Sequence, residues 1–238
     1  VYMLERLENI EKRYNELTEE MMKPEVIQNV KEALKLSREQ ASLKDAYEAY
    51  QEYKKITNNI EEAKEWLYKM VLKANKEIIS SGNKNPKLKG MGTTVISFLV
   101  TKDYKVYASV GDSRVYSYGK RKLVQVSEDQ TFAEALYKAG YINKKEAKNH
   151  PRRGMLLCAV GSAPNDMLDV QIKEVNQKDN YLICSDGLYN MVDETKIKKI
   201  LDEDISIKDK VNKLIDEAND NGGFDNISVI LLEECLWW

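Results

Sequence analysis

The chain has 238 residues, of which 42% are hydrophobic and 32% are charged, and its formal net charge at pH 7 is −2. This length allows one large or two modest domains, each with a hydrophobic core. The near balance of charges gives no reason to expect direct binding to nucleic acid or to an anionic membrane surface. No apolar run approaches the roughly 20 residues that span a bilayer. The three cysteines fit neither a zinc pattern nor a disulfide framework, so we expect a cytoplasmic protein.

The first third of the chain has the pattern of long amphipathic helices. Residues 3–81 contain one proline, Pro24, and no glycine, and apolar residues recur at a helical period on both sides of Pro24. Because proline suits the first turn of a helix and ends the helix before it, the pattern predicts two or three helices packed as an antiparallel hairpin. The helical pattern continues through Ile78, and the composition of residues 80–86 indicates a loop.

Strand patterns replace the helical period after Gly90. The predicted strands cover residues 93–101, 105–110, 115–118, 123–126, 168–175, 181–184 and 226–232, and the predicted helices cover 131–139, 143–149, 193–201 and 207–219. Turns are expected at 111–113 and at Gly119–Lys120. This order of elements indicates an α+β protein with an all-helical first part.

Two aspartates lie in short, glycine-flanked turns beside apolar runs. Asp186 precedes Gly187, and Asp225 follows the pair Gly222–Gly223. Carboxylates at strand ends can point into a cleft, and two that converge can hold a hard cation such as Mg²⁺ or Mn²⁺. Two carboxylates alone are too few for a catalytic metal centre. Ordinary turn aspartates are the alternative interpretation.

Eight short motifs follow one another in the second part of the chain. They are Gly90–Thr94, Val110–Tyr116, Glu128–Thr131, Ala139–Ile142, Ala147–Arg153, Ala159–Gly161, Cys184–Leu188 and Gly222–Asn226. In this order they resemble the bacterial form of the metal-dependent serine/threonine protein phosphatases of type 2C. The resemblance implies two antiparallel sheets packed face to face with helices outside. It also implies hydrolysis of phosphoserine and phosphothreonine by water that two metal ions activate.

The same resemblance assigns the metal ligands. It implies that Asp186 and Asp225 bind metal and that Asp112 is a candidate ligand of an additional, weaker ion. Asn190 stands where many relatives have an aspartate, which weakens that additional site. The alternative for Asp112 is a structural role in a turn, where it takes part in local hydrogen bonds.

The resemblance also indicates a flap beside the active site. It places Asp129, His150, Arg152 and Arg153 in a segment that shapes substrate access. A structural or surface role for His150 and a solvated pair of arginines are the alternatives. No side chain is assigned as a catalytic group, because metal-bound water is the nucleophile in this family.

The first part resembles a different family. The stretches Leu7–Tyr14, Lys35–Gln40 and Ala49–Lys55 are similar to the N-terminal helical domain of bacterial peptide chain release factor 1. The Gly-Gly-Gln signature of release factors is absent. We therefore expect a fusion: a helical hairpin in residues 1–67 and a truncated phosphatase 2C-like β-sandwich, flanked by helices, in residues 68–238.

The family's first strands, with their metal-binding aspartates and a phosphate-gripping arginine, have no counterpart in residues 1–89. Lys89 precedes Gly90 where an aspartate would be needed. We expect Mg²⁺ or Mn²⁺ to bind weakly or not at all, because Mg²⁺ is dehydrated reluctantly, and the isolated chain to have little or no phosphatase activity. An active phosphatase completed by another chain and a ribosome- or translation-factor-associated binding module are the alternatives. Expected partners are a second copy, through helices or open sheet edges, and a phosphoprotein if the chain is active.

Overall fold

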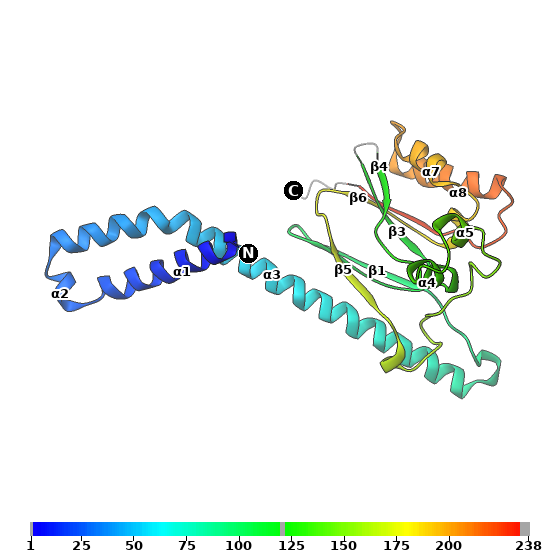
Figure 1. Cartoon of the computed structure of the whole chain (residues 1–238), viewed down its shortest axis with the longest axis horizontal. Coiled ribbons are helices and arrows are strands. Elements are labelled where there is room, and N and C mark those ends of the chain that lie inside the picture. Colours follow the sequence, from blue (N-terminus) through cyan, green and yellow to red (C-terminus); the bar gives the residue numbers. More distant parts are fainter. Residues whose placement is uncertain (1, 120–121, 234–238) are drawn as a thin grey trace. The chain divides into compact units, whose positions relative to one another are not determined.

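The computed structural model of the chain describes residues 2–119 and 122–233 (Figure 1). It forms two compact units, Val1–Glu61 and Glu62–Trp238. The boundary between them falls inside one continuous helix, α3, which runs from Val30 to Lys84. The sequence-based domain boundary after residue 67 stays a prediction. Within the described residues, no helix is both long and apolar enough to cross a membrane.

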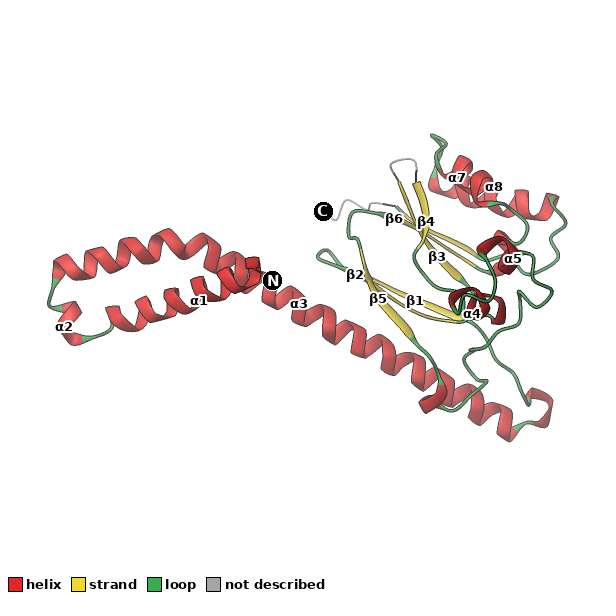
Figure 2. Cartoon of the chain, viewed as in Figure 1, coloured by secondary structure: helices red, strands yellow, loops and turns green. Residues whose placement is uncertain are grey.

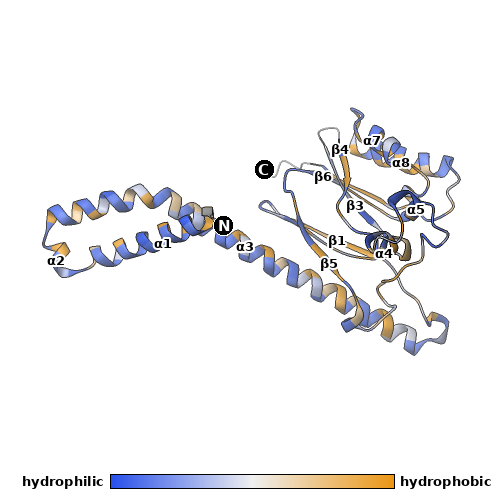
Figure 3. Cartoon of the chain, viewed as in Figure 1, coloured by the Kyte–Doolittle hydropathy of each residue, from blue (hydrophilic) through white to orange (hydrophobic). Residues whose placement is uncertain are grey.

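The first unit is an antiparallel helical hairpin, as the sequence pattern predicts. Helix α1 covers Tyr2–Met21, the short α2 covers Pro24–Ile27, and the first half of α3 returns alongside α1. Hydrogen bonds show that the two helices run antiparallel. Glu11 of α1 accepts from Gln51 and Lys54 of α3, whereas Thr18, later in α1, accepts from Gln40, earlier in α3. In Figure 3 these helices alternate between hydrophilic and hydrophobic residues along their length.

Two features of the helices differ from the sequence-based prediction. The chain breaks a second time between α2 and α3, and α3 continues through the segment 80–86 that indicated a loop, as far as Lys84. One glycine in a helix costs only about 1 kcal/mol, so Gly82 does not end α3. The helix ends at Lys84 because a residue before proline, here Asn85 before Pro86, avoids the helical region.

The second unit is a sandwich of two antiparallel sheets (Figure 2). One sheet has the order β1-β2-β5 and the other has the order β4-β3-β6-β7. The strands are β1 (Val95–Val100), β2 (Lys105–Val110), β3 (Arg114–Gly119), β4 (Lys122–Gln125), β5 (Gln171–Val175), β6 (Asn180–Cys184) and β7 (Val229–Leu232). The helices of this unit after α3 are α4 (Phe132–Lys138), α5 (Lys144–Lys148), α6 (Asp186–Tyr189), α7 (Glu194–Leu201) and α8 (Ile207–Asp220), with 3₁₀ turns at Pro86–Leu88 and Asn165–Met167. The predicted α+β class, with a helical hairpin before a β-sandwich, is confirmed.

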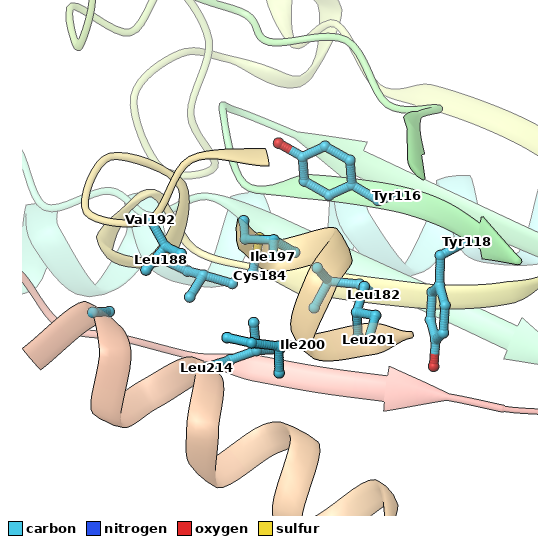
Figure 4. Packing of buried hydrophobic residues seen from close by; sticks show 11 residues of the cluster. Tyr116, Tyr118, Leu182, Cys184, Leu188, Val192, Ile197, Ile200, Leu201 and Leu214 are labelled. Carbon is cyan, nitrogen blue, oxygen red and sulfur yellow. The ribbon is translucent and has the colours of Figure 1, made fainter. Parts of the chain in front are cut away.

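The two faces of β3 and β6 pack into different cores. Val115 of β3 and Tyr181 of β6 pack with Tyr107 of β2 between the sheets. The alternate residues Tyr116 and Leu182 face outward, where they pack with residues of α6, α7 and α8 (Figure 4). This alternation follows from the two-residue period of a strand.

The last 23 residues of α3 belong to the second unit and carry a buried polar side chain. Asn75 has no exposed surface. Its amide nitrogen donates to the backbone oxygen of Ala163 at 2.9 Å and to the side chain of Asn165 at 2.8 Å, and its oxygen accepts from the backbone N–H of Gly161 at 2.6 Å. Figure 1 shows this part of α3 running along the β1-β2-β5 sheet. Asn75 therefore fastens the helix to the loop before β5.

Several predicted elements differ from the structure or lie partly outside the described residues. The strand predicted from residue 168 begins at Gln171, after a 3₁₀ turn, and the strand predicted from residue 226 begins at Val229. Asp186, predicted to lie in a turn, is the first residue of the short helix α6. The hairpin turn predicted at Gly119–Lys120 extends into residues outside the described ranges.

Candidate functional site

The two glycine-flanked aspartates lie at the same end of the second sheet. Strands β6 and β7 are antiparallel, and the described ladder ends at the pair Cys184 and Val229. The chain leaves β6 toward Asp186 and enters β7 from Asp225, so the topology brings the two loops together. Asp186 is half-buried and Asp225 is exposed.

Ser185 joins these two loops by hydrogen bonds. Its hydroxyl donates to the backbone oxygen of Asn226 at 3.0 Å and accepts from the backbone N–H of Ser228 at 2.9 Å. The backbone N–H of Ser185 also donates to the backbone oxygen of Ser228 at 3.1 Å. The spacing between Asp186 and Asp225 is therefore set by one serine as well as by the strand pair.

Two glycines permit this close approach for different reasons. A Cβ atom on Gly187 would lie 2.4 Å from the backbone oxygen of Asn226, a distance that no side chain tolerates. Gly223 has a φ of +55°, in the left-handed region, which turns the chain toward Asp225. The glycine-flanked pattern seen in the sequence thus reflects one close contact and one backbone turn.

The buried side of α6 holds Asp186 in place. Leu188 of α6 is completely buried and Val192, just after the helix, is 2% exposed, and both pack in the core with residues of α7 and α8 (Figure 4). Because the helix is anchored by these residues, its first residue stays at the surface of the sandwich end. Asn190 is exposed, and its backbone N–H closes the turn by donating to the oxygen of Asp186 at 3.0 Å.

Asp112 is close enough to Asp186 for the two charges to interact. It follows β2, is 8% exposed, and has its pKa raised to about 6 by burial, by the charge of Asp186 and by the charge of Asp129. The pKa of Asp186 is raised by burial and by the charge of Asp225. Asp186 therefore lies close enough to both Asp112 and Asp225 for their like charges to raise carboxyl pKa values at this end of the sandwich.

The described residues do not complete a cage for a metal ion. Carboxylate oxygens are the donors that Mg²⁺ and Mn²⁺ prefer. Within residues 2–119 and 122–233, however, no group of three histidine, cysteine, aspartate or glutamate side chains is arranged to hold an ion. The assignment of Asp112, Asp186 and Asp225 as ligands stays a prediction, and the chain's own residues give a partial donor set.

A second cluster of charged groups surrounds Arg114, at the start of β3. Its guanidinium donates to both carboxylate oxygens of Asp129, with an Nη2 to Oδ2 distance of 2.6 Å, and to the hydroxyl of Tyr116 at 2.9 Å. The guanidinium carbon also lies 3.6 Å from the ring centre of Tyr189, whose hydroxyl donates to the backbone oxygen of Asp112. Arg114 thus ties the base of the predicted flap to the strand that leads from Asp112.

A cavity of about 810 Å³ opens beside this cluster. Its floor includes Asp112, Arg114 and Tyr189, and its outer wall comes from α4, α5 and the turn after α5. Figure 2 shows these two helices in the long connection between β4 and β5. The base of this flap is closed by the bridge between Thr131 and Leu156. The cavity therefore lies between the flap and the end of the sandwich.

The four flap residues predicted from the sequence have different positions. Asp129 and Arg153 line the cavity. His150 does not line it, and its Nδ1 accepts the backbone N–H of Arg152 at 3.1 Å. The guanidinium of Arg152 lies 5.9 Å from the ring centre of Phe132, and Arg152 is also not among the lining residues. His150 thus shapes the flap turn in this structure, and the two neighbouring arginines are not equivalent.

Sequence reasoning did not identify several lining residues as functional candidates. Arg114 is one of them, and it stands in the motif Val110–Tyr116 that carries Asp112. Lys144 and Lys148 line the cavity from one face of α5. Their spacing of four residues in a short predicted helix is the signal that could have found them.

Comparisons with known proteins agree with both resemblances. The family model described as the PCRF domain matches residues 10–107. The serine/threonine phosphatase stp of Listeria welshimeri is 39% identical over 176 residues, which cover 74% of this chain and 70% of that protein. The crystal structure of the serine/threonine phosphatase Stp1 from Staphylococcus aureus matches with a TM-score of 0.67 and 33% identity, covering 73% of this chain and 68% of that one.

A third matching structure contains metal ions. It is the catalytic domain of the serine/threonine protein phosphatase PstP in complex with two manganese ions, with a TM-score of 0.57, 28% identity, and coverage of 67% of this chain and 66% of that one. The chain belongs to the family of bacterial serine/threonine phosphatases of type 2C, whose members depend on Mg²⁺ or Mn²⁺. It joins a release-factor-like helical part to a phosphatase part.

Proposed function

We propose that this chain is a catalytically impaired member of its family, which has kept the fold and part of the metal site. One observation carries the proposal. Asp186, Asp225 and Asp112 are gathered at one end of the sandwich, yet no group of three acidic, histidine or cysteine side chains in the described residues is arranged to hold an ion.

The residues that are present would bind a divalent ion weakly. A bound ion would supply a water of lowered pKa and would neutralise charge on phosphoryl oxygens. In this chain Asp186 and Asp225 would each offer carboxylate oxygens, held at a fixed spacing by Ser185. Because Mg²⁺ releases its water reluctantly and demands near-octahedral geometry, carboxylates that are not arranged around one point hold it poorly.

The test is a turnover assay on the purified chain with Mn²⁺ and a phosphothreonine peptide. We expect no turnover above that of the Asp186→Asn variant, which removes one donor and keeps the shape of the side chain. Release of phosphate at rates typical of enzymes, about 1 s⁻¹ or faster, that is lost in Asp186→Asn would overturn the proposal.

One structural feature supports an active phosphatase completed by another chain. Strand β7 is the last strand of its sheet in the described residues, and it starts just after the loop that carries Asp225. Ile230 in this strand is 55% exposed. An open edge can accept a strand from a second polypeptide. Metal titration of the wild-type chain against the Asp186→Asn variant tests this alternative, since a completed site predicts Mn²⁺ binding that the variant loses.

A different function follows from the helical part. The match to the PCRF domain over residues 10–107 supports association with ribosomes or with proteins that bind translation factors. Exposed apolar side chains at the turn of the hairpin, Met22, Ile27 and Val30, are available for such contacts. Co-sedimentation of the chain with ribosomes tests it. We also place the protein in the cytoplasm, which agrees with free thiols at Cys158 and Cys184.

A further inference from the structure

The part of α3 that belongs to the second unit is buried along one narrow stripe. Its buried side chains recur every three or four residues and are Ala63, Leu67, Val71 and Asn75. This part of the helix runs along the β1-β2-β5 sheet (Figure 1). A helix that packs on its neighbours through one stripe is expected to carry polar and charged residues on its remaining surface.

Two large apolar side chains of α3 depart from this expectation. Trp66 is 55% exposed and Met70 is 38% exposed. Because they are four residues apart, they lie next to each other on one face of the helix, and the exposed Ala74 continues this apolar row by one more turn. Single exposed apolar residues are normal on a protein surface, whereas a continuous row indicates a contact surface. Tryptophan is also among the residues that contribute most to protein interfaces.

Opposite charges lie at the two ends of the apolar row. Glu62 lies one turn before Trp66, and Lys73 lies three residues after Met70, on the same face. Both side chains are exposed, and neither forms an ion pair with a residue that the structure describes. Lys69, between them, is already paired with Glu65 at 2.6 Å. The row therefore begins beside a negative charge and ends beside a positive charge.

This order of charges makes the face complementary to itself when two copies run antiparallel. If Trp66 of one copy packs on Met70 of a second copy, two-fold symmetry packs Met70 of the first on Trp66 of the second. The same register brings Glu62 of each copy beside Lys73 of the other. One arrangement thus covers both apolar pairs and closes two ion pairs. A parallel arrangement would place like charges together at each end.

We propose that the face of α3 formed by Glu62, Trp66, Met70, Lys73 and Ala74 binds the same face of a second copy of this chain in an antiparallel, two-fold dimer. The inference goes beyond the proposed function, because it requires neither bound metal nor phosphatase activity. All five residues belong to the second unit. A contact over residues 62–74 is small, and small interfaces are typical of weak and reversible association.

The experiment is sedimentation equilibrium of the purified full chain over protein concentrations from about 1 to 200 µM, the range in which a weak dimer dissociates. We expect a monomer–dimer equilibrium. Trp66→Ser should weaken dimerisation at least about tenfold, since each dimer loses two tryptophans from the centre of its interface. Met70→Lys is a second variant of the same row and should act in the same direction.

The matched control is Tyr68→Ser. Tyr68 is 39% exposed, but it lies about 200° from Trp66 around the helix, outside the proposed contact. Dimerisation of this control should stay within about twofold of the wild-type chain. All of these positions are exposed, so the thermal melting temperature of each variant should stay close to that of the wild type, which separates lost association from lost folding.

Charge reversal tests the antiparallel register. Glu62→Lys and Lys73→Glu should each weaken dimerisation about fivefold, because each change places two pairs of like charges together in one dimer. The chain that carries both changes should recover the wild-type affinity, since opposite charges then face each other again. The effect of each single change should shrink in about 1 M salt, which screens exposed charges.

Three results would overturn the inference. The first is a chain that stays monomeric at every concentration. The second is a dimer that Trp66→Ser and Met70→Lys leave unchanged, which would place the contact on another surface, such as the open edge of β7. The third is a double charge reversal that dimerises as weakly as the single changes. None of these results depends on whether the chain binds Mn²⁺ or hydrolyses a phosphopeptide.

Discussion

The hydroxyl of Ser185 donates to the backbone oxygen of Asn226, which lies 41 residues further along the chain. Ser185 is the N-cap of α6, where a serine usually accepts a hydrogen bond from its own helix, but no such bond is present here. The side chain instead links the loop of Asp186 to the loop of Asp225. Ser185, although at the N-cap position of α6, thus connects the two loops that carry Asp186 and Asp225.

Replacement of Ser185 by alanine should loosen the second loop. The variant loses a donor to Asn226 and an acceptor for the N–H of Ser228, and we expect a loss of about 1 kcal/mol of stability, since both bonds are near the surface. Hydrogen exchange should become faster at residues 225–229. Ser206→Ala removes an ordinary N-cap from α8 at a similar cost. Equal exchange at residues 225–229 in both variants would show that Ser185 is only a helix cap.

Asn75 should be among the most sensitive polar positions of the chain. Asn75→Ala removes three hydrogen bonds from a fully buried site and leaves the N–H of Gly161 without its acceptor. We expect a loss of about 2 to 4 kcal/mol, measured by urea denaturation. Lys76→Ala, an exposed change on the same helix, should alter stability by about 0.5 kcal/mol or less. A similar small effect at Asn75 would mean that the helix is not fastened by this side chain.

The elements of the fold were largely predictable because their causes are local. Strands such as β3 and β6 alternate apolar residues between two cores, and the break at Pro24 follows from the geometry of proline. The end of α3 was placed too early, because a serine pair and Gly82 resemble a loop although a helix tolerates them. Asp186 was assigned to a turn because a one-turn helix has no detectable period.

The site was predictable only in part, because its contacts join distant residues. Glycine-flanked turns made Asp186 and Asp225 candidates, and the family resemblance added Asp112. No local pattern, however, shows that Asn75 accepts the N–H of a residue 86 positions away. The difference between Arg152 and Arg153 depends on how the flap turn is folded. In both cases tertiary structure decides what the sequence leaves open.

Glu128 should make stability depend on pH. Lys138 and Lys173 bind its carboxylate and lower its pKa from 4.5 to about 2. A lowered pKa in the folded state stabilises the protein above the unfolded value, and this stabilisation is lost as the pH falls toward 2. Because the three side chains are partly exposed to solvent, Glu128→Gln should cost less than about 1 kcal/mol at pH 7, and the cost should vanish as the pH falls through the folded-state pKa of about 2.

The measurement for Glu128 is urea denaturation of the wild type and the variant at several pH values between 2 and 7. Glu174→Gln is the matched control, since Glu174 is an exposed residue of β5 with no described ion pair. The difference between wild type and Glu128→Gln should also shrink in 1 M salt, which screens exposed charges. A difference that stays constant across the pH range would contradict the ion-pair explanation.

The ion pair between Arg114 and Asp129 should be strongly coupled. The two side chains are 20% and 12% exposed, so Asp129→Asn leaves a largely buried guanidinium without a counter-charge and should cost about 3 kcal/mol. Arg114→Lys should not be neutral, because lysine cannot donate to both carboxylate oxygens and stack on the ring of Tyr189. Urea denaturation measures both variants.

A double-mutant cycle separates this coupling from simple loss of packing. The variant with Arg114→Met and Asp129→Asn together should be less destabilised than the sum of the two single changes, by about 1 to 3 kcal/mol, because it leaves no unpaired charge. Glu194→Gln is the control, since Glu194 is 58% exposed and lies 4.0 Å from the same guanidinium. It should change stability by about 0.5 kcal/mol or less. Additive effects of the two single changes would mean that the flap base is held by packing, and the Arg114 to Asp129 pair would then have no special part in positioning the flap.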